Sequence, residues 1–107
     1  MKLNDLVKET YEAAKAKGWH DSKRSALECH MLIVSEVAEA TEAVRKGDQP
    51  FYIDQNGKPE GEAVELADAL IRICDYFGAN GWDLEQVVRD KLEYNKTRAY
   101  RHGGKLL

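Results

Sequence analysis

The chain has 107 residues, of which 33% are charged and 43% are hydrophobic, and its formal net charge at pH 7 is −3. This length fits one globular domain, residues 1–107, whose modest core favours association with a second copy. The acidic composition argues against a nucleic-acid polymer as partner. Two cysteines are too few for a disulfide framework or a zinc site of the paired-cysteine kind. The sequence shows neither a signal peptide nor a membrane-spanning apolar run, so we expect a cytoplasmic protein without a membrane partner.

Apolar residues recur at three-to-four spacing along most of the chain, which is typical of amphipathic helices. Gly18 and Gly47 are expected to end the first two helices. Asp83 is a favourable N-cap for the last helix. The pattern predicts four helices, at 2–17, 23–46, 61–77 and 83–98. The predicted fold class is therefore all-α, a four-helix bundle.

Residues 48–61 interrupt the helical pattern. The segment Phe51–Ile53 has strand character, and Asn56-Gly57 is a two-residue turn signal, so this region predicts a loop or small hairpin. We expect a turn at Gly78–Gly81 and an extended tail at residues 100–107.

Two pairs of carboxylates carry most of the functional information. Glu36 and Glu39 stand three residues apart in the second predicted helix, as do Glu65 and Asp68 in the third. Residues three apart lie on one helix face, and both pairs lie in apolar stretches, so the acids are predicted to converge inside the fold. Burying like charges together is costly, and a divalent cation would remove that cost. The alternative is that all four acids lie on solvated faces.

Oxygen ligands of this kind indicate Mg²⁺, with Mn²⁺ as a second candidate. A di-iron bundle would need Glu-x-x-His pairs on two helices, and the sequence contains none. Mg²⁺ commonly takes part of its coordination shell from a phosphate, so the acid pairs also predict a phosphate-bearing ligand.

Several other side chains are candidates for contact with such a ligand. Lys91, Asn95 and Arg98 follow one stripe of the fourth predicted helix and suit phosphate oxygens, unless they form an ordinary solvated basic face. Trp19 precedes the second predicted helix and either stacks on a base or packs against the start of that helix. Arg72 follows the acids of the third predicted helix, and we expect it to neutralise them through a structural salt bridge.

Two stretches resemble the MazG-like nucleotide pyrophosphohydrolases of the all-α NTP pyrophosphatase superfamily: Ser35-Glu-Val-Ala-Glu-Ala-Thr-Glu-Ala43, and the run from Val64 to Tyr76. The signature of that family is Glu-Glu-x-x-Glu, a variable spacer, and then Glu-x-x-Asp. Glu36, Glu39, Glu65 and Asp68 match its last four acids. Ser35 stands where the family has its first glutamate.

The resemblance implies Mg²⁺-dependent hydrolysis of standard or nonstandard nucleoside triphosphates to the nucleoside monophosphate and pyrophosphate. It implies that the four matching acids are the metal ligands and catalytic residues, and that Lys91, Asn95 and Arg98 contact the substrate. Trp19 is the further candidate for a substrate contact, on its place before the second predicted helix. It also implies a MazG-like bundle assembled as a homodimer or homotetramer. The alternative expectation is a non-catalytic helical interaction module that senses a nucleotide or a metal.

Overall fold

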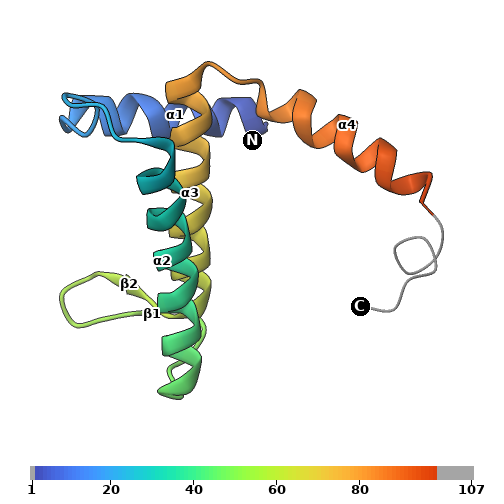
Figure 1. Ribbon diagram of the computed structural model, residues 1–107. Helices are drawn as coiled ribbons and strands as arrows, with labels where there is room; N and C mark the ends of the chain where they lie inside the picture. The colour runs from blue at the N-terminus through green and yellow to red at the C-terminus, as the bar shows by residue number, and fades with distance from the viewer. Residues whose placement is uncertain (1, 99–107) are drawn as a thin grey trace.

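The computed structural model describes residues 2–98, and most of them are helical. The predicted tail at 100–107 lies outside the described residues. Figure 1 shows two long helices side by side, a third crossing one end of the pair, and a fourth that extends away. The elements in chain order are α1 (Leu3–Ala16), α2 (Ala26–Arg45), β1 (Tyr52–Ile53), β2 (Pro59–Glu60), α3 (Glu62–Asn80) and α4 (Leu84–Lys96).

Side-chain caps determine where two of the helices begin. Ser25 and Glu28 form a capping box, in which Ser25 Oγ accepts from the Glu28 backbone N–H at 3.1 Å and Glu28 Oε1 accepts from the Ser25 backbone N–H at 3.4 Å. The second helix therefore starts at Ala26 and not at 23. Asp83 caps α4 as predicted, and its Oδ1 accepts from the Gln86 backbone N–H at 3.0 Å.

The third helix is longer than predicted, because the expected turn at Gly78–Gly81 is wrong. Gly78 remains helical, and the helix ends only where Gly81 adopts the left-handed conformation with φ 69°. A methyl group at Gly78 would lie 2.6 Å from Cβ of Tyr11, so glycine is needed there for α1 to approach α3. Close packing against another helix, which local sequence does not reveal, thus explains this glycine.

The hairpin between α2 and α3 confirms the prediction for residues 48–61, although its turn is wider than two residues. Tyr52 pairs with Glu60 and Ile53 with Pro59 in antiparallel register. The loop is closed by a hydrogen bond from the Asp54 backbone N–H to the Lys58 carbonyl at 2.9 Å. The Asp54 side chain also accepts from the Lys58 backbone N–H at 2.9 Å, and this local bonding favours the longer loop.

The core lies where α1 crosses the C-terminal half of α3. Val7, Cys74 and Leu84 are buried there, with Leu6, Phe77 and Val88 packed against them. Cys74 is completely buried, as expected for a small apolar residue, whereas Cys29 is only partly buried and both are free thiols. Leu84 is the first residue of α4 and Val88 lies one turn later, so this core holds only the N-terminal part of α4.

A single chain does not close into a compact bundle within residues 2–98. α4 touches α1, through the core and through Asn4, whose side chain donates to Asp83 at 2.9 Å, but it projects away from α2 and α3 (Figure 1). The radius of gyration of 16.6 Å exceeds the value of about 13 Å typical of a compact domain of this length. Large apolar side chains are left exposed, most of them on α2, α3 and α4, among them Leu27, Met31, Val34, Leu66, Leu70, Ile71 and Leu92. None of the helices in the described part of the chain could cross a membrane.

Candidate metal centre and adjoining pocket

Three of the four predicted acids meet between α2 and α3. Glu36 of α2 and Glu65 and Asp68 of α3 each offer a carboxylate oxygen, and these oxygens lie within 4.8 Å of one another. The two helices run antiparallel, so an acid pair on each can face the other (Figure 1). Glu36 is only 9% exposed, which makes it the one buried charged residue among those described.

The fourth predicted acid, Glu39, lies on the exposed edge of this cluster beside Glu65. Burial, a hydrogen bond with Glu39 and the negative charges of Glu39, Asp68 and Glu36 raise the pKa of Glu65 to about 7. Burial and the charge of Glu36 also raise the pKa of Asp68, although Arg72 counteracts this. The Glu65 carboxyl is therefore still partly protonated near neutral pH, and a cation bound among these acids would favour its ionised form.

This raised pKa predicts how the stability of the metal-free protein depends on pH. Glu65 binds its proton more tightly in the folded chain than at its ordinary pKa of 4.5, so its contribution favours folding at low pH and is lost as the pH rises through about 7. We expect the free energy of unfolding in EDTA to fall between about pH 5 and about pH 8, and to fall less in Glu65→Gln. Urea denaturation measures both slopes, and equal slopes in the two proteins would contradict the assignment.

Arg72 connects the acid cluster to the neighbouring pocket. Its Nε lies 3.3 Å from Glu36 Oε1, and its guanidinium lies 5.7 Å from the centre of the Trp19 ring. The structure thus gives Arg72 a salt bridge, but the partner is an acid on α2 and not the acids of its own helix. Trp19 remains about half exposed and available for further contact.

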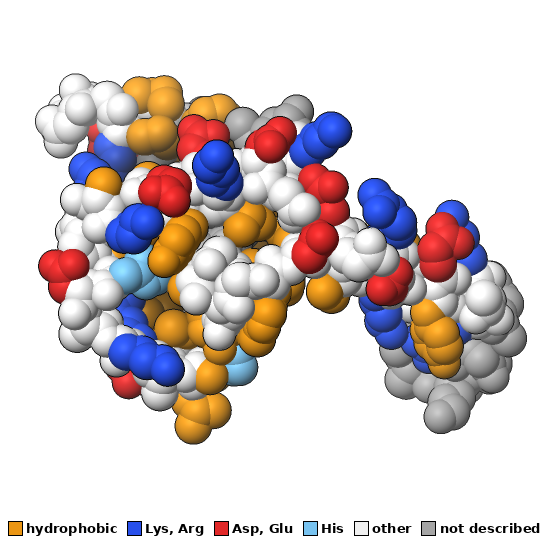
Figure 2. All heavy atoms as spheres, turned by 90° about the horizontal axis from the view of Figure 1, so that it is seen from above, with side chains coloured by type: hydrophobic (Ala, Val, Ile, Leu, Met, Phe, Trp, Pro, Cys, Tyr) orange, Lys and Arg blue, Asp and Glu red, His pale blue; other side chains and the backbone are white. Residues whose placement is uncertain are grey.

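A pocket of ≈ 530 Å³ lies next to the cluster, between the end of α1, the start of α2 and the C-terminal half of α3. Tyr11, Trp19 and Tyr76 supply aromatic walls, and Lys23 and Arg24 supply positive charge. Figure 2 shows a hollow at this end of the molecule with hydrophobic side chains in it and basic side chains around it. Such a mixture suits a flat, partly apolar ligand that carries negative charge.

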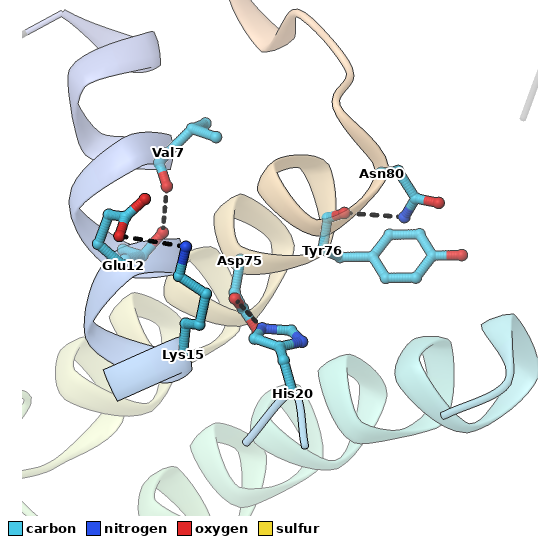
Figure 3. Close-up of polar contacts among 8 residues, drawn as sticks. Val7, Glu12, Lys15, His20, Asp75, Tyr76 and Asn80 are labelled. Carbon is cyan, nitrogen blue, oxygen red and sulfur yellow. Dashed lines mark hydrogen bonds and ion pairs between the residues drawn. The ribbon is translucent and has the colours of Figure 1, made fainter. Parts of the chain in front are cut away.

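A histidine and an aspartate form a hydrogen-bonded pair in the wall of this pocket (Figure 3). His20 Nε2 lies 2.7 Å from Asp75 Oδ1, and the His20 ring packs 5.1 Å from that of Tyr11, centre to centre. Neither residue is among the ligand contacts predicted from the sequence. Asp75 follows Arg72 by three residues and Asp68 by seven, so the spacing places all three on one face of the helix. This shared face is the sequence feature that marks Asp75 as a candidate site residue.

The predicted phosphate contacts, two on α4 and Arg98 just beyond its end, are not brought to the acids within one chain. Lys91, Asn95 and Arg98 are exposed, none of them lines the pocket, and α4 points away from α2 and α3 (Figure 1). The Lys91 ammonium group instead lies 5.1 Å from the centre of the Tyr94 ring on the same helix.

No protein-family model, curated protein or solved structure matches this chain. Ser35, which departs from the signature of the resembled family, is exposed, and its hydroxyl donates to the Leu32 carbonyl at 2.6 Å. It is not among the three residues that converge, so the cluster forms without a first glutamate at that position.

Proposed function

We propose that this protein is a Mg²⁺-dependent hydrolase that cleaves nucleoside triphosphates to the nucleoside monophosphate and pyrophosphate, like the MazG-like enzymes it resembles. The observation that supports this best is the convergence of Glu36, Glu65 and Asp68 within 4.8 Å, beside a pocket with aromatic and basic walls. An all-oxygen donor set suits a hard cation, and the adjoining pocket suits a nucleoside.

The residues fit a Mg²⁺ or Mn²⁺ ion on the chemistry of their donors. Glu36, Glu65 and Asp68 would hold it, with Glu39 as a fourth ligand from the edge of the cluster. Burial and the neighbouring negative charges raise the pKa of Glu65, so both effects oppose its ionised form when no positive charge is close. A bound divalent cation supplies that charge, neutralises phosphate oxygens and lowers the pKa of an attacking water.

The chain's own side chains would then position the substrate and move the proton. In this proposal Trp19 stacks on the nucleobase in the pocket, and Arg72 keeps Glu36 oriented while itself held against Trp19. Glu39, exposed beside Glu65, accepts the proton of the water that attacks phosphorus. The bond between that phosphorus and the oxygen that bridges it to the next phosphate breaks, so that pyrophosphate leaves and the nucleoside monophosphate remains.

We also propose that the working form is a homodimer or homotetramer in which a second copy completes the bundle. Apolar side chains exposed on α2 and α3 form a surface that is typical of a protein–protein interface. Val87, Leu92 and Tyr94 are exposed on α4, which does not pack along its own α2–α3 pair. A second copy placed against these faces would bring Lys91 and Asn95 towards an acid cluster that they do not reach within their own chain. Sedimentation at micromolar concentration measures the assembly, and a purely monomeric protein would contradict it.

The direct test of the proposed reaction is pyrophosphate release from a panel of nucleoside triphosphates in Mg²⁺. We expect release from at least one nucleotide, its loss in EDTA, and its recovery when Mg²⁺ or Mn²⁺ is restored. Thermal unfolding should also shift upwards with added Mg²⁺, because an ion that binds only the folded state stabilises it. Absence of release from every nucleotide would reject the enzyme, and nucleotide binding without release would instead support the sensing module.

A further inference from the structure

The His20–Asp75 pair has no part in the hydrolysis proposed above, yet it lies in the pocket wall. The side chains are 28% and 19% exposed, so the hydrogen bond between them is largely shielded from water. Packing of the His20 ring against Tyr11 restricts it further. The imidazole is thus held in one orientation by two independent contacts.

Asp75 also determines which nitrogen of His20 carries the hydrogen. An ionised carboxylate only accepts hydrogen bonds, so the Nε2 that lies 2.7 Å from Asp75 must be the donor. In the neutral ring the other nitrogen, Nδ1, is then an acceptor. Figure 3 shows this nitrogen directed away from Asp75, and no residue within 2–98 hydrogen-bonds to it.

The spacing of this pair from the acids along α3 suits the nucleobase end of a nucleotide whose phosphates the acid cluster would hold. Asp75 lies seven residues beyond Asp68 on α3, a distance of about 10 Å along the helix axis. That is comparable with the length of a nucleoside monophosphate between its phosphate and the far edge of its base. The polar atom most distant from the sugar is the exocyclic group of the base, which is an amino group in cytosine and adenine and a carbonyl oxygen in uracil and hypoxanthine.

We infer that His20 reads the base, and that with Asp75 fixing its tautomer it selects nucleotides whose base presents an amino group over those that present a carbonyl oxygen. The inference rests on the proposed function, because it names the substrate class of the same site. An amino group can donate a hydrogen bond to Nδ1. A carbonyl oxygen has no hydrogen to donate, and its lone pair would face the lone pair of Nδ1. One such hydrogen bond corresponds to a preference of about tenfold.

Binding of nucleoside monophosphates tests this without any turnover. Calorimetry at about pH 8 should show CMP binding about tenfold more tightly than UMP, and AMP more tightly than IMP. His20→Phe keeps a ring against Tyr11 but has no acceptor, so both ratios should fall to about one. Asp75→Asn should lower them as well, because an asparagine amide is able to donate to Nε2 and leave the hydrogen on Nδ1.

His30→Phe is the matched control, because His30 packs edge-on against Tyr76 outside the pocket lining and should leave the ratios unchanged. Circular dichroism melts establish that each variant is folded. Equal or reversed preferences in the unaltered protein, or no binding of any monophosphate, would overturn the role of His20 even if triphosphates are hydrolysed. A preference for CMP and AMP without any pyrophosphate release would uphold it while the proposed hydrolysis fails.

Discussion

Asp68→Asn is expected to lower pyrophosphate release by about 10²- to 10³-fold while the metal-free protein becomes more stable. The carboxylate is one of three that converge between α2 and α3, and asparagine keeps its shape but removes a charge that a cation needs. The same change relieves repulsion from Glu36, the largest charge effect on Asp68. Initial rates of pyrophosphate release and urea denaturation in EDTA measure the two effects.

Asp48→Asn is the control for this experiment. Asp48 is an exposed aspartate just beyond α2 and outside the converging cluster, so its replacement should change neither rate nor stability appreciably. The combination of lost activity and gained stability distinguishes a metal site from a structural one. If Asp68→Asn destabilised the metal-free protein and left the rate unchanged, the acids would have no role in holding a cation.

Gly61→Ala is expected to lower the free energy of unfolding by about 2–4 kcal/mol and to weaken Mg²⁺ binding. Gly61 has φ +115°, which side chains rarely adopt, and a Cβ there would lie 2.5 Å from the carbonyl oxygens of Gln49 and Pro50. Gly61 is also the N-cap of α3, four residues before Glu65, so displacing it moves the acid-bearing turn. Chemical denaturation and Mg²⁺ titration measure the two effects.

Gly57→Ala separates backbone conformation from close packing. Gly57 also has positive φ, +81°, but a Cβ there would meet nothing within 4 Å. Its replacement should therefore lower the free energy of unfolding by only about 1–2 kcal/mol, because only the left-handed backbone conformation is unfavourable there. Mg²⁺ binding should be unchanged. Equal losses at Gly57 and Gly61 would mean that the contact with Gln49 and Pro50 has no energetic consequence.

Local sequence predicts most of the secondary structure because most of its causes are local. The apolar periodicity predicted four helices, and Asp83 was recognised as a cap because an N-cap acts on backbone groups two or three residues away. The same reasoning failed at Gly78, where a glycine looked like a helix end. Its small size is required by Tyr11 of another helix, and a contact of that kind leaves no local pattern.

The candidate site also has one part that local sequence predicts and one part that depends on packing between helices. The spacing of the acids on α2 and α3 placed each pair on one helix face, and this follows from helix geometry alone. Their meeting within 4.8 Å depends on the antiparallel register of two helices, which spacing within one helix does not specify. The salt bridge from Arg72 to Glu36 on the other helix illustrates the difference, because sequence spacing had pointed to the acids of its own helix.

The helices, the hairpin region and the spacing of the acid pairs follow from the amino-acid sequence, because hydrophobic periodicity, turn residues and helical spacing act over a few neighbouring positions. The departure of α4 from its own α2–α3 pair and the contact of His20 with Asp75, 55 positions away, follow from tertiary packing. Packing between distant segments depends on the shape and burial of both partners together. No run of neighbouring residues contains that information.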